Sequence, residues 1–140
     1  MRVLIDTNVF LEYLLHREQY QTVDHFFFLA AKQYNQTFIT SMSLRDIGYI
    51  IHRQRRNDED AKKAQFQVYN MVSKVVGISA DVALNSLFSE SKDYEDELQI
   101  QAAEEAMCVA IVTLNKKDYL KARIPTFTPK EICELWLNNK

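Results

Sequence analysis

The chain has 140 residues, close to the commonest length of a single domain, and its 47% hydrophobic content is sufficient for a buried core. Its 17 basic and 19 acidic side chains give a net charge of −2, which excludes a strong attraction of the whole protein to nucleic acid but not a local basic patch. No apolar run approaches the ~18 residues of a membrane span, and the chain starts with a strand pattern rather than a secretory signal. We therefore expect one cytoplasmic domain, residues 1–140, that is not in a membrane.

The first half of the chain predicts two strands and four helices. Strand patterns are rich in apolar, β-branched or aromatic residues, whereas helices repeat apolar residues about every 3.6 positions. One such helical face comprises Val23, Phe26, Phe27, Ala30 and Ala31. In chain order we expect a strand at 2–5, helices at about 8–15 and 20–34, a strand at 37–40, a helix at about 43–55 capped by Ser41 or Ser43, and a helix at about 59–73.

The second half continues the same alternation. We expect a strand at 75–78, a short helix beginning at Asp81, a helix at about 95–108, a strand at 109–113, a short helix within 115–122, an edge strand after Pro125 and a helix at about 129–138. The helix at about 95–108 is expected to pack through Leu98, Ala102, Ala106 and Met107. Strands that alternate with helices are typical of an α/β fold, with a parallel sheet covered on both faces.

Several polar residues follow the predicted strands or begin helices. In a parallel sheet these positions lie at the carboxyl edge, where open α/β sheets bind ligands. Each residue alone has an ordinary explanation, because acids also form turns and solvated first turns of helices. The set comprises Asp6, Asp46, Asp96, Asn115 and Asp118.

Four segments, in order along the chain, resemble the motifs of PIN-domain ribonucleases. They are Val3–Val9, Ile39–Ile51, the pair Ala83–Ser86 and Lys92–Gln99, and Ile111–Tyr119, and Thr126–Glu131 is similar to the family's strand-and-helix ending. The resemblance implies a three-layer α/β/α fold with a mainly parallel sheet. It also implies an endoribonuclease that hydrolyses RNA phosphodiester bonds with Mg²⁺ or Mn²⁺.

The resemblance also assigns roles to residues. Asp6, Asp46 and Asp96 are the implied metal-facing carboxylates, and Asp118 or Asn115 completes the catalytic site. The chain departs from many relatives in having Asn115 where they carry Asp. Residues that position the acids or bound waters are expected to be Thr7, Asn8, Thr113 and Asn115.

A small single-domain PIN protein is similar to the toxin half of a VapBC-type toxin–antitoxin pair. That similarity implies an antitoxin partner and a homodimer, and Phe26, Phe27 and Phe28 are compatible with an interface because one helix face cannot bury three consecutive aromatic residues. For RNA contact the candidates are Arg45, Arg53, Arg55, Arg56, Lys116 and Lys117, and a solubilising surface is the favoured interpretation of Arg53–Arg56. Tyr49, Tyr94 and Tyr119 either pack or stack on bases, and packing is the favoured interpretation.

Two other functions are compatible with the sequence. A catalytically weak PIN-fold module that binds RNA or protein is favoured by Asn115, which adds no charge to the site. A receiver-type signalling domain or phosphatase is disfavoured, because the first strand does not end in an adjacent pair of acids and no suitable lysine follows the last strand. The sequence does not identify the RNA target or the antitoxin.

Overall fold

The computed structural model describes residues 1–33, 35–91 and 93–139. Lys92, part of the third motif, and Tyr34, at the predicted end of the second helix, lie outside the described residues. In chain order the elements are β1 (Arg2–Ile5), α1 (Thr7–Leu14), α2 (Tyr20–Lys32), β2 (Gln36–Thr40), α3 (Ser41–Arg55), α4 (Asp58–Met71), β3 (Lys74–Val76), α5 (Ala80–Leu87), α6 (Tyr94–Glu105), β4 (Ala110–Val112), the 3₁₀ helix η1 (Lys116–Tyr119), β5 (Thr126–Phe127) and α7 (Pro129–Asn138). None of the helices in these ranges is long and apolar enough to cross a membrane.

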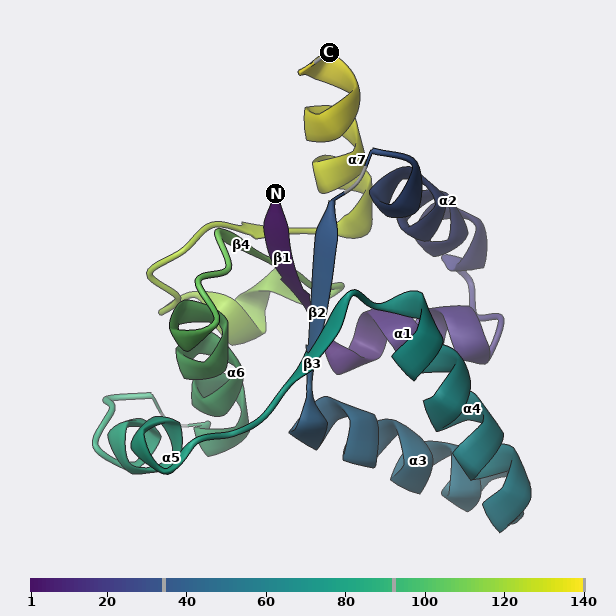
Figure 1. Ribbon diagram of the computed structural model, residues 1–140, viewed down its shortest axis with the longest axis horizontal. Helices are drawn as coiled ribbons and strands as arrows, with labels where there is room; N and C mark the ends of the chain where they lie inside the picture. The colour runs from purple at the N-terminus through teal and green to yellow at the C-terminus, as the bar shows by residue number, and fades with distance from the viewer. Residues whose placement is uncertain (34, 92, 140) are drawn as a thin grey trace.

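The five strands form one sheet in the order β3-β2-β1-β4-β5, and every neighbouring pair is parallel. Figure 1 shows α5 and α6 on one side of the sheet and α1, α2 and α4 on the other. The expected three-layer α/β/α fold is therefore confirmed, with a wholly parallel sheet. Because β1 is central, the residue that follows it lies between the ends of β2 and β4.

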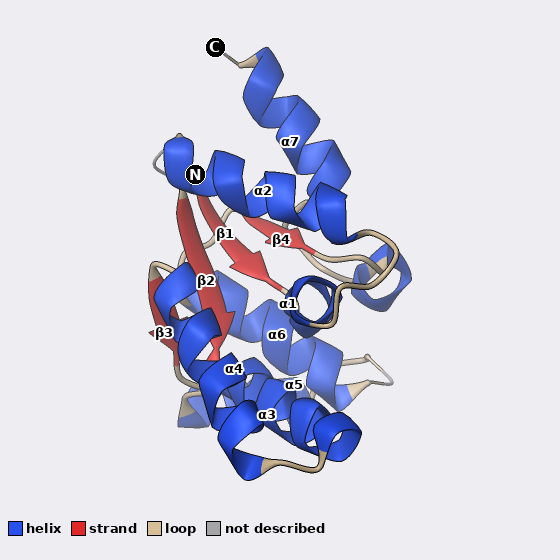
Figure 2. Cartoon of the chain, turned by 90° about the vertical axis from the view of Figure 1, so that its right-hand side faces the viewer, coloured by secondary structure: helices blue, strands red, loops and turns tan. Residues whose placement is uncertain are grey.

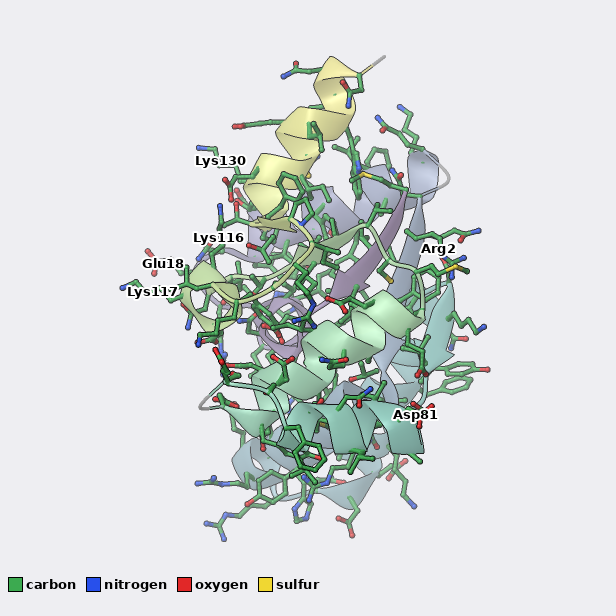
Figure 3. The ribbon with its side chains drawn as sticks, turned by 90° about the vertical axis from the view of Figure 1, so that its left-hand side faces the viewer. Arg2, Glu18, Asp81, Lys116, Lys117 and Lys130 are labelled. Carbon is green, nitrogen blue, oxygen red and sulfur yellow. The ribbon has the colours of Figure 1, made fainter. Side chains whose placement is uncertain are left out.

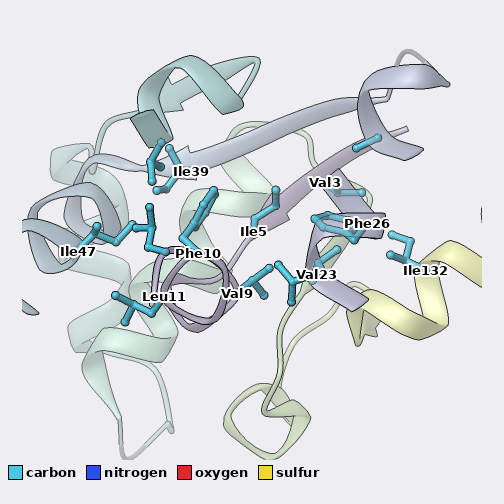
Figure 4. Close-up of a cluster of buried hydrophobic side chains, with 14 of the residues drawn as sticks. Val3, Ile5, Val9, Phe10, Leu11, Val23, Phe26, Ile39, Ile47 and Ile132 are labelled. Atoms are coloured by element: carbon cyan, nitrogen blue, oxygen red, sulfur yellow. The ribbon is translucent and has the colours of Figure 1, made fainter. Parts of the chain in front are cut away.

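The alternation of side chains along β1 builds the two cores. Val3 and Ile5 face the larger core, which contains residues of α1, α2, α3, α4 and α7 (Figure 4). Leu4 faces the opposite core, with Ile100 of α6 and Tyr119 of η1. The helices thus cover both faces of the sheet (Figure 2). This arrangement leaves the carboxyl edge of the sheet accessible between α3 and α6.

Two helix ends differ from the sequence prediction. Thr40, rather than Ser41 or Ser43, caps α3: its hydroxyl accepts a hydrogen bond from the Ser43 N–H at 3.0 Å, so the helix begins at Ser41. The α6 helix ends at Glu105, because Met107 adopts a left-handed backbone with φ 58°. Met107 is 71% exposed, so its predicted packing was wrong.

The predicted inward face of α2 also needs correction. Ala31 is exposed, and Leu29 is buried in its place. Phe26 is fully buried and stacks on Trp136 at 5.6 Å between ring centroids, whereas Phe28 is 59% exposed. The three consecutive phenylalanines therefore do not form one exposed surface.

Candidate metal and RNA site

A cleft of about 520 Å³ opens at the carboxyl edge of the sheet. Its walls come from the start of α1, from α3, from the start of α6 and from η1. Four carboxylates predicted from the sequence line it: Asp6, Asp46, Asp96 and Asp118. Asn115 is exposed outside the residues that line the cleft, so Asp118 is the member of that loop that faces it.

Asp6 is held rigidly at the base of the cleft and is only 9% exposed. One carboxylate oxygen, Oδ1, accepts the Thr7 N–H at 2.8 Å and thereby caps α1. The other, Oδ2, accepts the Thr113 hydroxyl at 2.8 Å. The carboxylate is thus fixed by the residue after β4 and by the N-terminus of a helix, whose dipole favours negative charge.

The residues around Thr113 connect the fourth motif to the first. The Thr113 hydroxyl accepts hydrogen bonds from the Asn8 side-chain amide at 3.3 Å and from the Asn115 N–H at 3.0 Å. The Asn8 carbonyl oxygen in turn accepts the Leu114 N–H at 3.2 Å. Asn115 therefore takes part through its backbone, and Asn8 and Thr113 orient the loop after β4.

A second, largely buried network joins Ser43 and Thr7 to Gln99 and Thr40, two residues with no role predicted from the sequence. The Gln99 amide nitrogen lies 2.9 Å from the Ser43 hydroxyl and 3.5 Å from Asp6 Oδ1, and its oxygen accepts the Thr40 hydroxyl at 2.7 Å. Thr7 donates its hydroxyl to Ser43 at 2.7 Å. Gln99 lies three residues after Asp96 on the same helix, so this spacing was the available signal that it faces the site.

Burial and neighbouring negative charge raise the pKa values of two acids of the cleft. Burial, together with the nearby charges of Asp93, Asp118 and Asp6, raises the pKa of Asp96 to about 7. Burial also raises the pKa of Asp6, although the hydroxyl groups of Thr113 and Tyr119 and the Thr7 N–H oppose that rise. Among the described residues, no lysine or arginine forms an ion pair with Asp6, Asp96 or Asp118, whereas Asp46 pairs with Arg45 at 3.0 Å.

Tyr119 adds an unusual buried polar group to the same place. Its side chain is 2% exposed, and its hydroxyl lies near Asp6 but, within the described residues, makes no hydrogen bond of good geometry. Burial, followed by the charge of Asp6, raises the pKa of this phenol, so the hydroxyl stays protonated. A donor without a well-formed hydrogen bond beside a buried carboxylate is available to a bound ligand or water.

These residues fit a hard divalent cation. Carboxylate oxygens are the ligands that Mg²⁺ prefers, and it commonly keeps several waters and takes only one or two carboxylates directly. The described part of the chain contains no group of three His, Cys, Asp or Glu residues close enough to hold one ion. A cation would offset the uncompensated charge of Asp6, Asp96 and Asp118.

The predicted basic residues divide between two locations. Arg45 lines the cleft, and so does Arg53, a candidate for RNA contact for which a solubilising role was favoured. Lys116 instead pairs with Glu131 of α7 at 3.2 Å, and both Lys116 and Lys117 lie outside the cleft lining, at the edge shown in Figure 3. The basic side chains that line the cleft therefore come from α3.

Comparison with known proteins assigns the fold and the family. No curated protein sequence matches the chain. Solved structures that share its fold include a toxin–antitoxin complex from Klebsiella pneumoniae, with a TM-score of 0.65, 22% identity, and coverage of 92% of this chain and 98% of that one. VapBC2 from Rickettsia felis, bound to a promoter DNA fragment, has a TM-score of 0.64, 17% identity, and coverage of 91% of this chain and 98% of that one. VapC20 from Mycobacterium tuberculosis, a toxin that cleaves the sarcin–ricin loop, has a TM-score of 0.67, 11% identity, and coverage of 85% of this chain and 94% of that one. The family model of the PIN domain matches residues 2–117, which include Asp6, Asp46 and Asp96. The chain therefore belongs to the PIN domain family.

Proposed function

We propose that this protein is a metal-dependent endoribonuclease and the toxin of a toxin–antitoxin pair. The observation that carries the proposal is the convergence of Asp6, Asp96 and Asp118 on one cleft, with no basic partner among the described residues. The toxin–antitoxin complexes with the same fold support the second part. By analogy with them we also propose an antitoxin partner, a homodimer and a cytoplasmic location.

Each residue has a role in the proposed hydrolysis. Asp6, Asp46 and Asp96 would hold Mg²⁺ or Mn²⁺, in part through waters that the ion keeps, and Asp118 would complete the catalytic set. When bound, the cation activates water and offsets charge on the phosphoryl oxygens. Thr113 holds Asp6 through its hydroxyl. Thr7, Asn8 and the backbone of Asn115 fix the elements around it.

The basic residues would bind the RNA backbone. Arg45 is placed to contact a phosphate at the cleft, and its pairing with Asp46 would loosen when Asp46 turns to a cation. Lys116 and Lys117 would contact RNA farther from the reacting phosphate. Contacts of this kind weaken as salt concentration rises.

Metal binding is tested first, without RNA. A ligand that binds only the folded state raises the thermal midpoint, so Mn²⁺ or Mg²⁺ should raise it relative to EDTA. Asp96→Asn should reduce the rise. If Asp6→Asn combined with Asp96→Asn still shows the full rise, these residues do not hold the metal.

Cleavage is tested on stem-loop and single-stranded RNAs. With Mg²⁺ or Mn²⁺ the products should carry 5′-phosphate and 3′-hydroxyl ends, and EDTA should prevent cleavage. Products ending in cyclic 2′,3′-phosphate would mean that the 2′-hydroxyl attacks and would refute hydrolysis by water. Metal binding without cleavage of any RNA tested would favour a binding module instead.

A further inference from the structure

Three side chains form a row along α3 at the rim of the cleft. Arg45, Tyr49 and Arg53, here called the α3 ladder, are spaced four residues apart, so they lie on one face of the helix and span about 12 Å. The guanidinium carbons of Arg45 and Arg53 lie 5.6 Å and 5.9 Å from the centre of the Tyr49 ring. All three line the cleft.

The ladder does not contribute to the core. Ile47 and Ile51, on the opposite side of α3, are fully buried, whereas Tyr49 is 53% exposed. The Arg45 side chain is 75% exposed, and Arg53 is exposed as well. Tyr49 and both cations are therefore exposed at the cleft, and apart from its contacts with the two arginines the ring packs into no hydrophobic cluster of the described residues.

The two walls of the cleft differ in charge. The ladder places two arginines on α3, one of them paired with Asp46 of the same helix, whereas Glu95 and Asp96 come from the start of α6. A nucleic-acid strand lying across the cleft can place one phosphate at the acids, where a cation offsets its charge, and neighbouring phosphates at the arginines. The base between those phosphates then meets the Tyr49 ring.

We propose that the α3 ladder is a subsite for one unpaired nucleotide, which stacks its base on Tyr49 and binds its flanking phosphates to Arg45 and Arg53. This inference rests on the proposed function and places one unpaired nucleotide of its RNA substrate at a defined set of side chains on α3. A base in a duplex has its faces covered by neighbours and cannot stack on the ring, whereas splayed bases of single strands stack readily on aromatic side chains.

The test measures binding separately from cleavage. Every protein carries Asp6→Asn, which removes charge from the reaction site, and fluorescence anisotropy follows a labelled single-stranded ribo-oligonucleotide or the duplex of the same sequence. Tyr49→Ala should weaken single-strand binding about tenfold, as expected for one base–aromatic stack, and should leave duplex binding unchanged. Tyr49→Phe keeps the stacking face and should bind within about twofold of the parent protein.

Two further variants identify the cause of any loss. Tyr69→Ala removes another exposed tyrosine, which lies on α4 outside the cleft lining, and should change nothing. Arg53→Gln should weaken binding and make the slope of log affinity against log salt shallower by about 0.7, the value for one phosphate of a single strand.

Three results would overturn the subsite: unchanged binding in Tyr49→Ala, equal loss for single strand and duplex, or a loss in Tyr69→Ala as large as that in Tyr49→Ala. A selective loss in Tyr49→Ala supports it whether or not the wild-type protein cleaves RNA. Failure of cleavage therefore counts against the proposed function alone, and failure of selective binding counts against the ladder alone.

Discussion

Replacing Thr113 with valine tests whether the site is held together at Asp6. Valine keeps the shape of this fully buried side chain but removes the hydroxyl that donates to Asp6 Oδ2 at 2.8 Å. The same hydroxyl accepts the Asn8 amide at 3.3 Å and the Asn115 N–H at 3.0 Å, so three hydrogen bonds are lost together.

The expected cost follows from the charge of the acceptor. A hydrogen bond to a charged group contributes about 1.5–3 kcal/mol, and removing one partner leaves a buried carboxylate incompletely solvated. Solvent from the cleft can replace part of the weaker bonds to Asn8 and Asn115. We therefore expect Thr113→Val to lower the free energy of unfolding by about 2–3 kcal/mol in EDTA at neutral pH.

Thr37 on strand β2 provides a matched control. It is also buried, and its hydroxyl accepts the Ser73 N–H at 3.2 Å, its one hydrogen bond to the part of the chain that the structure describes. That N–H keeps its bond to the Thr37 carbonyl at 2.9 Å, so Thr37→Val should cost about 0.5 kcal/mol. Urea unfolding followed by circular dichroism measures both variants.

Metal binding gives the second measurement. Thr113→Val should weaken Mn²⁺ binding in calorimetry, because Asp6 loses a contact that fixes its carboxylate, whereas Thr37→Val should bind Mn²⁺ like the wild type. If Thr113→Val costs no more than Thr37→Val and binds Mn²⁺ normally, then the hydroxyl does not organise the site, and the reasoning from hydrogen-bond geometry is refuted.

Three more predictions concern single residues of the cleft. The pKa of Asp96 is raised from an ordinary value of 3.8 to about 7 in the folded protein, so the folded state binds more protons than the unfolded state between these pH values. The thermal midpoint in EDTA should therefore fall as pH rises through that range. Asp96→Asn should flatten this dependence of the midpoint on pH, and an unchanged dependence would refute the raised pKa of Asp96. Asp118→Asn should reduce single-turnover RNA cleavage about tenfold more than Asn115→Ala, because Asp118 lines the cleft and Asn115 does not. A tenfold difference is equivalent to about 1.4 kcal/mol of transition-state stabilisation. Equal activity in Asp118→Asn and wild type would show that Asp118 is only a turn residue. Tyr119→Phe removes a buried hydroxyl that makes no well-formed hydrogen bond among the described residues, so the free energy of unfolding in EDTA should be unchanged or higher. The rise in thermal midpoint that Mn²⁺ causes should be smaller in this variant. A rise equal to that of the wild type would show that the hydroxyl plays no part in metal binding.

The order of elements was predictable from local patterns. Short apolar strands alternate with amphipathic helices along the chain, and this alternation leads to a parallel sheet with helices on both faces. Helix ends were less predictable, since they depend on single contacts. Thr40 caps α3 although two serines follow it, and α6 ends early because Met107 turns into the left-handed region.

The presence of the four carboxylates at the cleft was predictable from the order of strands and motifs along the chain. Asp6 follows a strand directly, so its place at the sheet edge follows from topology, and motif order gave Asp46, Asp96 and Asp118. The network behind them was harder to foresee, because Gln99 lies in the sequence as one polar residue of a charged helix. Its position beside Asp6 depends on how α6 packs on the sheet.

Asp6 serves the folding of the chain as well as the site, since the carboxylate proposed to hold a cation is also the N-cap of α1. Asparagine caps helices about as well as aspartate, whereas alanine at such a position costs about 1 kcal/mol. An alanine substitution would therefore confuse lost chemistry with a frayed helix, and asparagine is the informative replacement. Because Asp6 also caps α1, few residue types are tolerated at this position during evolution. A lineage that lost nuclease activity would still be selected to keep aspartate, asparagine, serine or threonine there. In a relative of this protein, a polar residue after the first strand is consequently weaker evidence of nuclease activity than an acid at the position of Asp96.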